Sequence, residues 1–189
     1  MQVADSDEPV VEVNQVSKGG NIYEIKGLRV VTIDSDKALK TVDFSKEKEL
    51  IIHSFAAGAH GRDPQLLILA DTETAYVFDI PILDASALRA TLSKLPPVIG
   101  YDVKSSLQVL LELGIPLPAV SGDVLIGSFL VNPLRRTRNL GELAENDLGY
   151  TGSSLDDLTL QQTAERAGEI AAVIAELNTL QGESISELT

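Results

Sequence analysis

Apolar residues along the chain are grouped into short runs, and their spacing predicts a series of strands and helices. Buried strands are predicted at 49–55, 65–70 and 75–79, because each run is short and rich in branched or aromatic side chains. The last two runs are separated by the polar tetrapeptide 71–74, which is typical of a hairpin turn. A β-branched stretch at 29–33 predicts one further strand ahead of these three.

In the second half of the chain, helix-like spacing alternates with short strand-like runs. Pro96 and Pro97 end one helix and Gly114 ends the next, since proline cannot continue a helix and glycine tolerates the backbone of a helix end. Residues 123–131 are apolar almost all round, which predicts a buried helix. The elements predicted in this half are helices at 84–95, 103–113, 123–131, 139–148 and 159–180, and strands at 98–101 and 119–122.

These elements predict an α/β domain with a mixed sheet flanked by helices. A three-strand meander is followed by two crossover strands, an order that resembles the ribonuclease H-like fold. We predict an acidic linker or weakly ordered arm at 1–28, the domain itself at 29–181, and a tail at an interdomain boundary at 182–189.

Composition narrows the range of functions. The 189 residues are 44% apolar and carry a net charge of −13. The chain can therefore bury a core but is poorly suited to gripping phosphates, because lysine and arginine supply most of that affinity. Aromatic residues make up only 4%, which leaves few side chains to stack on bases. The lack of cysteine excludes disulfides and thiol chemistry and fits a cytoplasmic protein. The sequence also contains no apolar run long enough to span a membrane.

One basic cluster interrupts this acidic chain. It consists of Arg135, Arg136 and Arg138, which follow the proline that ends the helix at 123–131. Two interpretations remain open: the arginines contact a phosphate backbone or the acidic face of a neighbouring domain, or they form a solvated turn.

Three segments carry a resemblance to a known family. They read Ile-Gly-Tyr-Asp-Val-Lys-Ser-Ser-Leu at 99–107, Gly-Ile-Pro-Leu at 114–117 and Gly-Asp-Val-Leu-Ile-Gly-Ser-Phe-Leu-Val-Asn-Pro at 122–133. In this order the segments resemble the closing half of the 3′–5′ proofreading exonuclease domain of bacterial DNA polymerase I. The similarity covers most of the chain and is most specific in these segments.

Active members of that family hold two divalent metal ions with four carboxylates, two on the first strand, one on the crossover helix and one on the last helix. Laid onto this chain, these positions fall on His53, Phe55, Ser106 and Ile170, and the tyrosine of the last-helix motif falls on Arg166. None of the four ligand positions is acidic, whereas magnesium requires hard oxygen ligands. The resemblance therefore implies an exonuclease-like domain with no catalytic residues and no metal cofactor.

A rival hypothesis is an active Mg²⁺-dependent 3′–5′ exonuclease with a shifted carboxylate site. Asp71 and Glu73 match the family's first metal motif letter for letter, but too little chain follows them for the rest of the meander, so we interpret them as turn residues. Asp102 and Asp123 precede helices and are predicted to be N-caps. His53 lies in an apolar strand and is predicted to be a core histidine.

The resemblance also implies partners. A vestigial exonuclease domain would lie between the 5′-nuclease and polymerase domains of one chain, as a spacer and docking module in bacterial DNA replication and repair. It would reside in the cytoplasm, associated with the nucleoid through the parent polymerase, and would itself contact DNA weakly or not at all. A third hypothesis is a free-standing interaction protein with the same fold.

Overall fold

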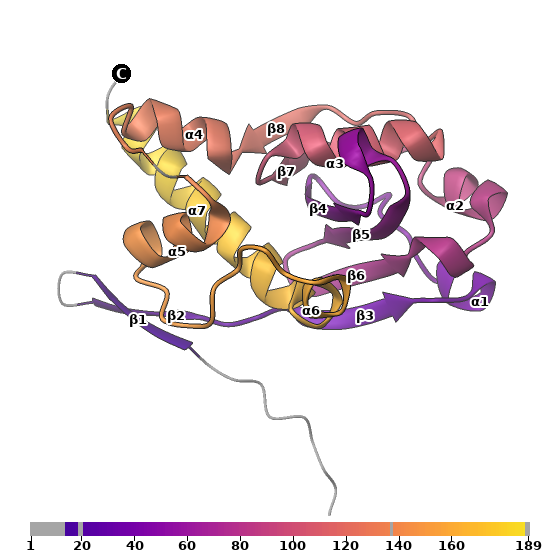
Figure 1. Cartoon of the computed structure of the whole chain (residues 1–189), viewed down its shortest axis with the longest axis horizontal. Helices are drawn as coiled ribbons and strands as arrows, with labels where there is room; N and C mark the ends of the chain where they lie inside the picture. Colours follow the sequence, from indigo (N-terminus) through magenta and orange to yellow (C-terminus); the bar gives the residue numbers. More distant parts are fainter. Residues whose placement is uncertain (1–13, 19–20, 137, 188–189) are drawn as a thin grey trace, which may run out of the picture.

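The computed structural model describes residues 14–18, 21–136 and 138–187. A six-stranded mixed sheet contains β3 (Arg29–Ile33), β4 (Leu50–Ala56), β5 (Pro64–Ala70), β6 (Thr74–Asp79), β7 (Val98–Gly100) and β8 (Val120–Asp123). Its spatial order is β3-β6-β5-β4-β7-β8 (Figure 1). Strands β4, β5 and β6 form an antiparallel meander, while β7, β8 and β3 add in parallel to their neighbours.

This sheet confirms the fold predicted from the sequence, a three-strand meander followed by two crossover strands. The leading strand β3 is also present and forms the edge next to β6. Parallel strands cannot be joined by a tight turn, so α2 lies between β6 and β7 and α3 lies between β7 and β8, whereas the meander strands are joined by short polar connections.

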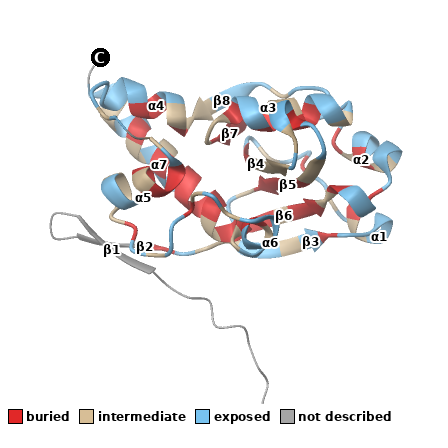
Figure 2. Ribbon diagram, viewed as in Figure 1, coloured by how far each residue is buried: buried red, intermediate tan, exposed pale blue. Residues whose placement is uncertain are grey.

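Helices cover both faces of the sheet (Figures 1 and 2). One face is covered by α1 (Asp36–Leu39), α2 (Ala85–Thr91) and α3 (Val103–Leu113). The other is covered by α5 (Leu140–Leu148), α6 (Leu160–Glu165) and α7 (Ala167–Ser186). The remaining helix, α4 (Val124–Val131), follows β8 and packs against α7.

Two apolar cores result, one on each face of the sheet. In β4, Ile51 belongs to the core beneath α7, whereas Leu50 and Ile52 belong to the core beneath α3. This alternation is what a strand buried on both faces requires, and it explains why β4 reads as a continuous apolar run. We refer to the two as the α7-side core and the α3-side core.

The N-terminal stretch differs from the linker or arm predicted at 1–28. Strands β1 (Asn14–Lys18) and β2 (Asn21–Ile25) pair as an antiparallel hairpin, and Ile25 is buried in the α7-side core. The backbone N–H of Leu28 donates to the carbonyl of Gly168, where a Cβ on the glycine would lie 2.0 Å from the Leu28 carbonyl oxygen. The end of this stretch therefore belongs to the folded body, while residues 1–13 and 19–20 lie outside the described part.

Three helix boundaries also differ from the sequence-based prediction. The helix predicted at 159–180 is divided at Arg166 into α6 and α7, and α7 continues to Ser186, into the segment predicted as a tail. Helix α2 ends at Thr91, before the predicted end at residue 95. The short helix α1 was not predicted, because one turn of helix leaves almost no periodic signal.

The apolar sequence of α4 predicted a helix buried on all sides, but one side of α4 is exposed. Its inner face, which includes Gly127 and Ser128, is buried, but Ile126 is 56% exposed and Leu130 is 59% exposed. The sheet ends at β8, so α4 is covered by α7 on one side only. Among the described residues, no helix is both long and apolar enough to cross a membrane.

Candidate functional site

Side chains of β4 point alternately to the two faces of the sheet. As a result, the β4 positions matched to metal ligands lie on the opposite face from the matched position on α3. His53 and Phe55 share the face of Ile51, and Phe55 packs against the α7-side core. Ser54 lies on the opposite face, where its hydroxyl is 3.0 Å from the hydroxyl of Ser106 on α3. The α3 position therefore meets Ser54 rather than His53 or Phe55.

The strand itself offers no carboxylate in any register. Residues 50–56 contain neither aspartate nor glutamate, so shifting the match by one residue does not supply an acidic pair. Ser106 is 2% exposed, and its hydrogen bond with Ser54 holds α3 against β4. The two hydroxyls form a small structural contact with no charge to neutralise a metal ion.

On the last helix, the matched positions have structural partners. Ile170 is 1% exposed and is part of the α7-side core. Arg166, at the break between α6 and α7, donates to Glu169 at 2.7 Å, to the hydroxyl of Tyr150 at 2.9 Å, and to the carbonyl of Ser154 at 2.6 Å. Arg166 thus fastens the loop that follows α5 to the start of α7.

Tyr150 completes this network at the centre of the loop. Its ring is buried, and its hydroxyl is hydrogen-bonded to the Glu169 carboxylate. Burial, followed by the hydrogen bond to Glu169, raises the pKa of Tyr150, so the phenol stays protonated. The loop is therefore held by a satisfied polar network and offers no unpaired general base.

His53 and Tyr101 lie near a group of carboxylates at the end of the strands. Removal from water lowers the pKa of His53 to about 4, and the charge of Asp102 partly opposes this effect. Burial raises the pKa of Tyr101 to about 12, with further contributions from Asp156, Asp102 and Asp123. The Tyr101 hydroxyl donates to the Arg138 carbonyl at 2.8 Å. Both rings are neutral at physiological pH.

Asp123 caps two helices. One carboxylate oxygen accepts the Leu125 N–H at 3.0 Å at the start of α4, and the other accepts the Val103 N–H at 2.9 Å at the start of α3. Its predicted role as a cap is therefore confirmed. Asp102 occupies the N-cap position of α3 but has a left-handed backbone, and its carboxylate accepts from the Ser105 hydroxyl at 2.6 Å instead of from a backbone amide.

Asp71 and Glu73 lie in the turn between β5 and β6. The Asp71 side chain accepts the N–H groups of Glu73 and Thr74, each at 2.7 Å. This arrangement is an Asx turn, and the hairpin interpretation of the 71–74 segment is correct. The carboxylate of Asp71 is oriented toward its own backbone.

Within residues 14–18, 21–136 and 138–187, no three histidine, aspartate or glutamate side chains are placed to hold a metal ion together. The carboxylates of Asp71 and Asp123 are used as backbone acceptors, and Ile170 and Phe55 carry no ligand atoms. The prediction that the chain binds no metal cofactor remains a prediction.

The three arginines of the basic cluster have different surroundings. Arg135 forms a two-pronged ion pair with Asp147 across to α5, which raises the pKa of the guanidinium. The guanidinium of Arg138 lies 3.7 Å from the centre of the Phe129 ring. Arg136 is exposed. The Arg138 guanidinium also donates to the carbonyls of Asn132 at 3.2 Å and Pro133 at 3.0 Å. Arg135 and Arg138 are therefore both engaged within the chain, and Arg136 is the exposed arginine of the cluster.

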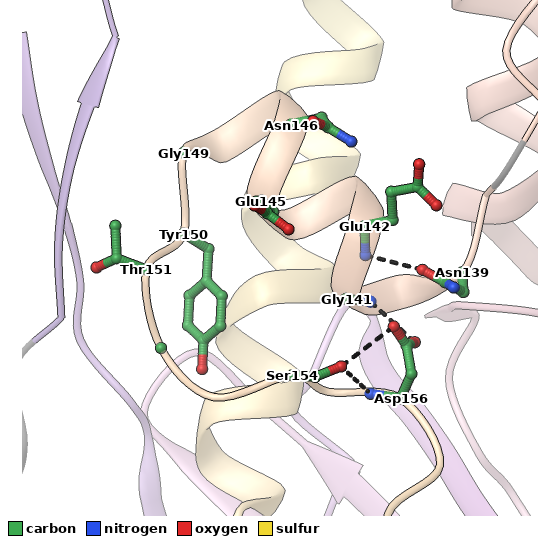
Figure 3. Close-up of a pocket in the computed structure, with 11 residues that line it drawn as sticks. Asn139, Gly141, Glu142, Glu145, Asn146, Gly149, Tyr150, Thr151, Ser154 and Asp156 are labelled. Carbon is green, nitrogen blue, oxygen red and sulfur yellow. Dashed lines mark hydrogen bonds between the residues drawn. The ribbon is translucent and has the colours of Figure 1, made fainter.

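A polar pocket of about 760 Å³ lies between α5 and the 149–156 loop (Figure 3). At its base, Asn139 accepts the N–H of Glu142 at 2.9 Å and Asp156 accepts the N–H of Gly141 at 3.0 Å. The amides at the start of α5 are thus already capped. With Glu142 and Glu145 also in its lining, the pocket is acidic and unsuited to a phosphate.

The sequence analysis missed two contacts of Arg166 and the role of Ser54. The Arg166–Glu169 pair has the i, i+3 spacing of a helical ion pair, which is a readable signal. The partnership of Arg166 with Tyr150 spans 16 residues and has no such local signal. Ser54 was not singled out, because its role depends on the position of α3.

No protein-family model matches the chain, and no curated protein matches its sequence. Its fold is similar to that of solved exonuclease structures. RNase D of Trypanosoma brucei superposes with a TM-score of 0.63 at 12% identity over 81% of this chain and 64% of that chain. RNase D of Escherichia coli, an exoribonuclease involved in structured RNA processing, gives 0.62 at 18% identity over 85% of this chain and 49% of that chain.

A polymerase structure is also similar. The POL domain of Pol1 from M. smegmatis, in complex with a DNA primer-template and dNTP, gives a TM-score of 0.61 at 18% identity over 86% of this chain. The match covers 28% of that longer chain. This chain thus spans less than two thirds of the length of each of the three solved chains, the two RNase D chains and Pol1. These likenesses establish an exonuclease-like, ribonuclease H-like fold.

Proposed function

We propose that the chain is a catalytically inactive exonuclease-fold domain of a bacterial DNA polymerase I. Its role there is structural, as a spacer and docking module between the 5′-nuclease and polymerase domains during DNA replication and repair. The observation that carries this proposal is that none of the positions matched to the family's metal ligands holds an acidic side chain. β4 has no carboxylate, Ser106 lies on the opposite face of the sheet from His53 and Phe55, and Ile170 is in the core.

The polymerase part of the proposal rests on two kinds of likeness. The segments at 99–107 and 122–133 resemble the proofreading domain of that polymerase family. The fold is also similar to part of the Pol1 structure from M. smegmatis. A net charge of −13 agrees with a domain that does not hold DNA by itself.

A shifted active site is the rival function, and the local geometry argues against it. Two metal ions need several carboxylates around a common point. Asp71 and Glu73 lie in the β5–β6 turn, while Asp123 is engaged as a cap for two helices. Asp102 is bonded to Ser105.

The loss of nuclease activity is tested by titrating Mn²⁺ and Mg²⁺ into the purified chain by calorimetry. Shortening of 5′-labelled single-stranded DNA and RNA is followed in the same samples, with E. coli RNase D as a working comparison. We expect no binding heat and no shortened product. Metal binding with trimming from the 3′ end would overturn the proposal, provided that Asp102→Asn or Asp123→Asn removes the trimming.

The role as a domain of a longer polymerase is tested separately. An antibody against the chain is used to probe cells that make the protein. We expect one band far larger than the 20.2 kDa of this chain, and we expect it to coincide with DNA polymerase activity in immunoprecipitates. A band at the size of the chain alone would favour a free-standing interaction protein.

A further inference from the structure

Strand β3 forms one margin of the six-stranded sheet, because it pairs with β6 on one side and with no described strand on the other (Figure 1). The backbone N–H of Arg29 donates to the Glu73 carbonyl at 3.0 Å, so Arg29 and Val31 bond toward β6. Consecutive residues of a strand bond to opposite sides. The N–H and C=O groups of Val30 and Thr32 therefore point outward, and we call this row of groups the β3 edge.

The β3 edge lacks the features that usually keep an exposed strand from pairing with another chain. Residues 29–33 contain no proline and no lysine, and their register with β6 is unbroken. The one charged side chain, Arg29, reaches back over the sheet to the Thr74 hydroxyl at 3.2 Å. Val30 is 39% exposed, and Thr32 is also exposed. The opposite margin, β8, is a strand of four residues with a register shift against β7, so the β3 edge is better suited to strand addition.

The backbone groups of the β3 edge are complementary to themselves. When two copies pair antiparallel about Val31, Val30 of each copy lies opposite Thr32 of the other. Both residues direct their N–H and C=O groups outward, so each such pair exchanges two backbone hydrogen bonds, and the twofold axis repeats the pair. The ladder ends there, because the N–H of Leu28 already donates to the Gly168 carbonyl. The backbone thus fixes one register for self-pairing.

The two ends of β3 carry opposite charge. Lys26 and Arg29 lie at its start, Asp34 and Asp36 follow its end, and all four are exposed. None of them forms an ion pair among the described residues. Lys37 follows Asp36 in α1, so the end of the strand keeps an excess of negative charge. Antiparallel pairing in the register above sets Lys26 of one copy opposite Asp36 of the other, which places unlike charges together at both ends.

We propose that the β3 edge is a self-association surface, on which a second copy of this chain adds its own β3 antiparallel, so that the two sheets become one continuous sheet around a twofold axis. The side chains of Val31 meet at the axis, and β-branched pairs of this kind favour strand pairing. Because β3 has only five residues, the interface is small and the dimer is reversible. This inference goes beyond the proposed function and does not depend on it.

Other pairings fit these observations less well. Parallel addition of a second β3 would bring like charges together at each end of the strand. Open-ended assembly of copies through β3 and β8 requires an unbroken β8, which the register shift interrupts. A strand from an unrelated protein would have to reproduce the charges at both ends, whereas a second copy supplies them by symmetry.

Sedimentation velocity of the full chain over a range of concentrations tests the proposal. We expect the average mass to rise reversibly from 20.2 kDa toward twice that value. Val30→Pro removes an outward N–H and spares the bonds to β6, so it should weaken dimerisation by about tenfold or more. Val120→Pro is the matched control and should leave the dimer intact. Val120 is 49% exposed on β8, and its N–H also points outward, since the neighbouring Ala119 carbonyl faces β7. Circular dichroism shows that both variants are folded.

The register is tested by cross-linking. The chain has no cysteine, so Val31→Cys places a single thiol at the twofold axis. Facing residues of such a non-hydrogen-bonded pair have Cα atoms about 4.5 Å apart, which is within the range of a disulfide. Oxidation with oxidised glutathione should link two copies of Val31→Cys, whereas Val120→Cys should stay unlinked.

Charge is tested by reversal. Lys26→Glu and Asp36→Lys should each weaken dimerisation, because like charges then face one another, and the two substitutions together should restore it. A chain that stays monomeric at every concentration would overturn the proposal. So would a dimer that survives Val30→Pro and gives no cross-link at residue 31, or a dimer that only Val120→Pro disrupts. None of these readouts depends on nuclease activity or on a parent polymerase, so this inference and the proposed function fail independently.

Discussion

At the scale of single residues, His53 carries the clearest acid sensitivity of the fold. Its pKa is lowered to about 4 by removal from water, although the charge of Asp102 opposes the shift. A histidine in the unfolded chain titrates near 6.5. The folded state therefore disfavours the proton, and the stability contributed by neutral His53 is present above pH 6.5 and is lost as the pH falls toward 4.

We expect the free energy of unfolding to fall by roughly 2–3 kcal/mol from this residue between pH 7.5 and 4.5. Urea unfolding at both pH values should show a smaller loss for His53→Gln than for the wild type. His60→Gln is the control, because His60 is exposed, and it should keep the wild-type pH dependence. An unchanged loss in His53→Gln would contradict the neutral state of the half-buried His53.

At the scale of elements, Asp123 links two helices, because it starts α4 and also accepts the N–H of Val103 at the start of α3, 20 residues earlier in the sequence. A single N-cap contributes about 1 kcal/mol, and Asp123 caps both α3 and α4. Asp123→Ala should therefore lower the free energy of unfolding by roughly 2–3 kcal/mol. Asp84→Ala, which removes the cap of α2 alone, should cost about 1 kcal/mol in the same chemical-denaturation assay. Equal losses would mean that the Val103 contact adds nothing.

The loop after α5 is held to α7 by Arg166. Arg166→Met keeps the apolar stem of the side chain but removes its hydrogen bonds to Tyr150, Glu169 and Ser154. We expect amide hydrogens of residues 150–155 to exchange at least about tenfold faster, because local opening becomes easier. Arg89→Met, at an exposed arginine on α2, should leave this loop unchanged in hydrogen-exchange mass spectrometry. Unchanged exchange in Arg166→Met would show that the loop is held by its buried apolar side chains.

At the scale of the whole molecule, the last-helix position that matches a metal ligand of the family is part of the core. Ile170 is 1% exposed, so Ile170→Asp buries an unpaired charge and should cost more than about 4 kcal/mol, or prevent folding. Ile170→Val should cost about 1 kcal/mol in thermal unfolding. An Ile170→Asp chain as stable as the wild type would mean that water reaches this position, and that a metal site there is feasible.

The order of the meander and crossover strands, most of the helices around them and the missing acids could be predicted from the sequence, whereas α1 and the break between α6 and α7 could not. β4, β5 and β6 are compact apolar runs bounded by polar residues, so their identity as strands is a local property. The hairpin turn at Asp71 is likewise local, because its hydrogen bonds span two and three residues. The absence of acidic residues from β4 is a fact of composition and needs no coordinates.

Only the tertiary structure decided which apolar and polar side chains meet. Ser54 and Ser106 are 52 residues apart in sequence, and their contact depends on the position of α3 against the sheet. Helix α4 is apolar on every side, so its sequence carries no periodic signal for a buried face, and its exposure follows from the end of the sheet at β8. Local sequence determines the elements and their order. Burial and partnership depend on distant segments, because they arise only when those segments pack together.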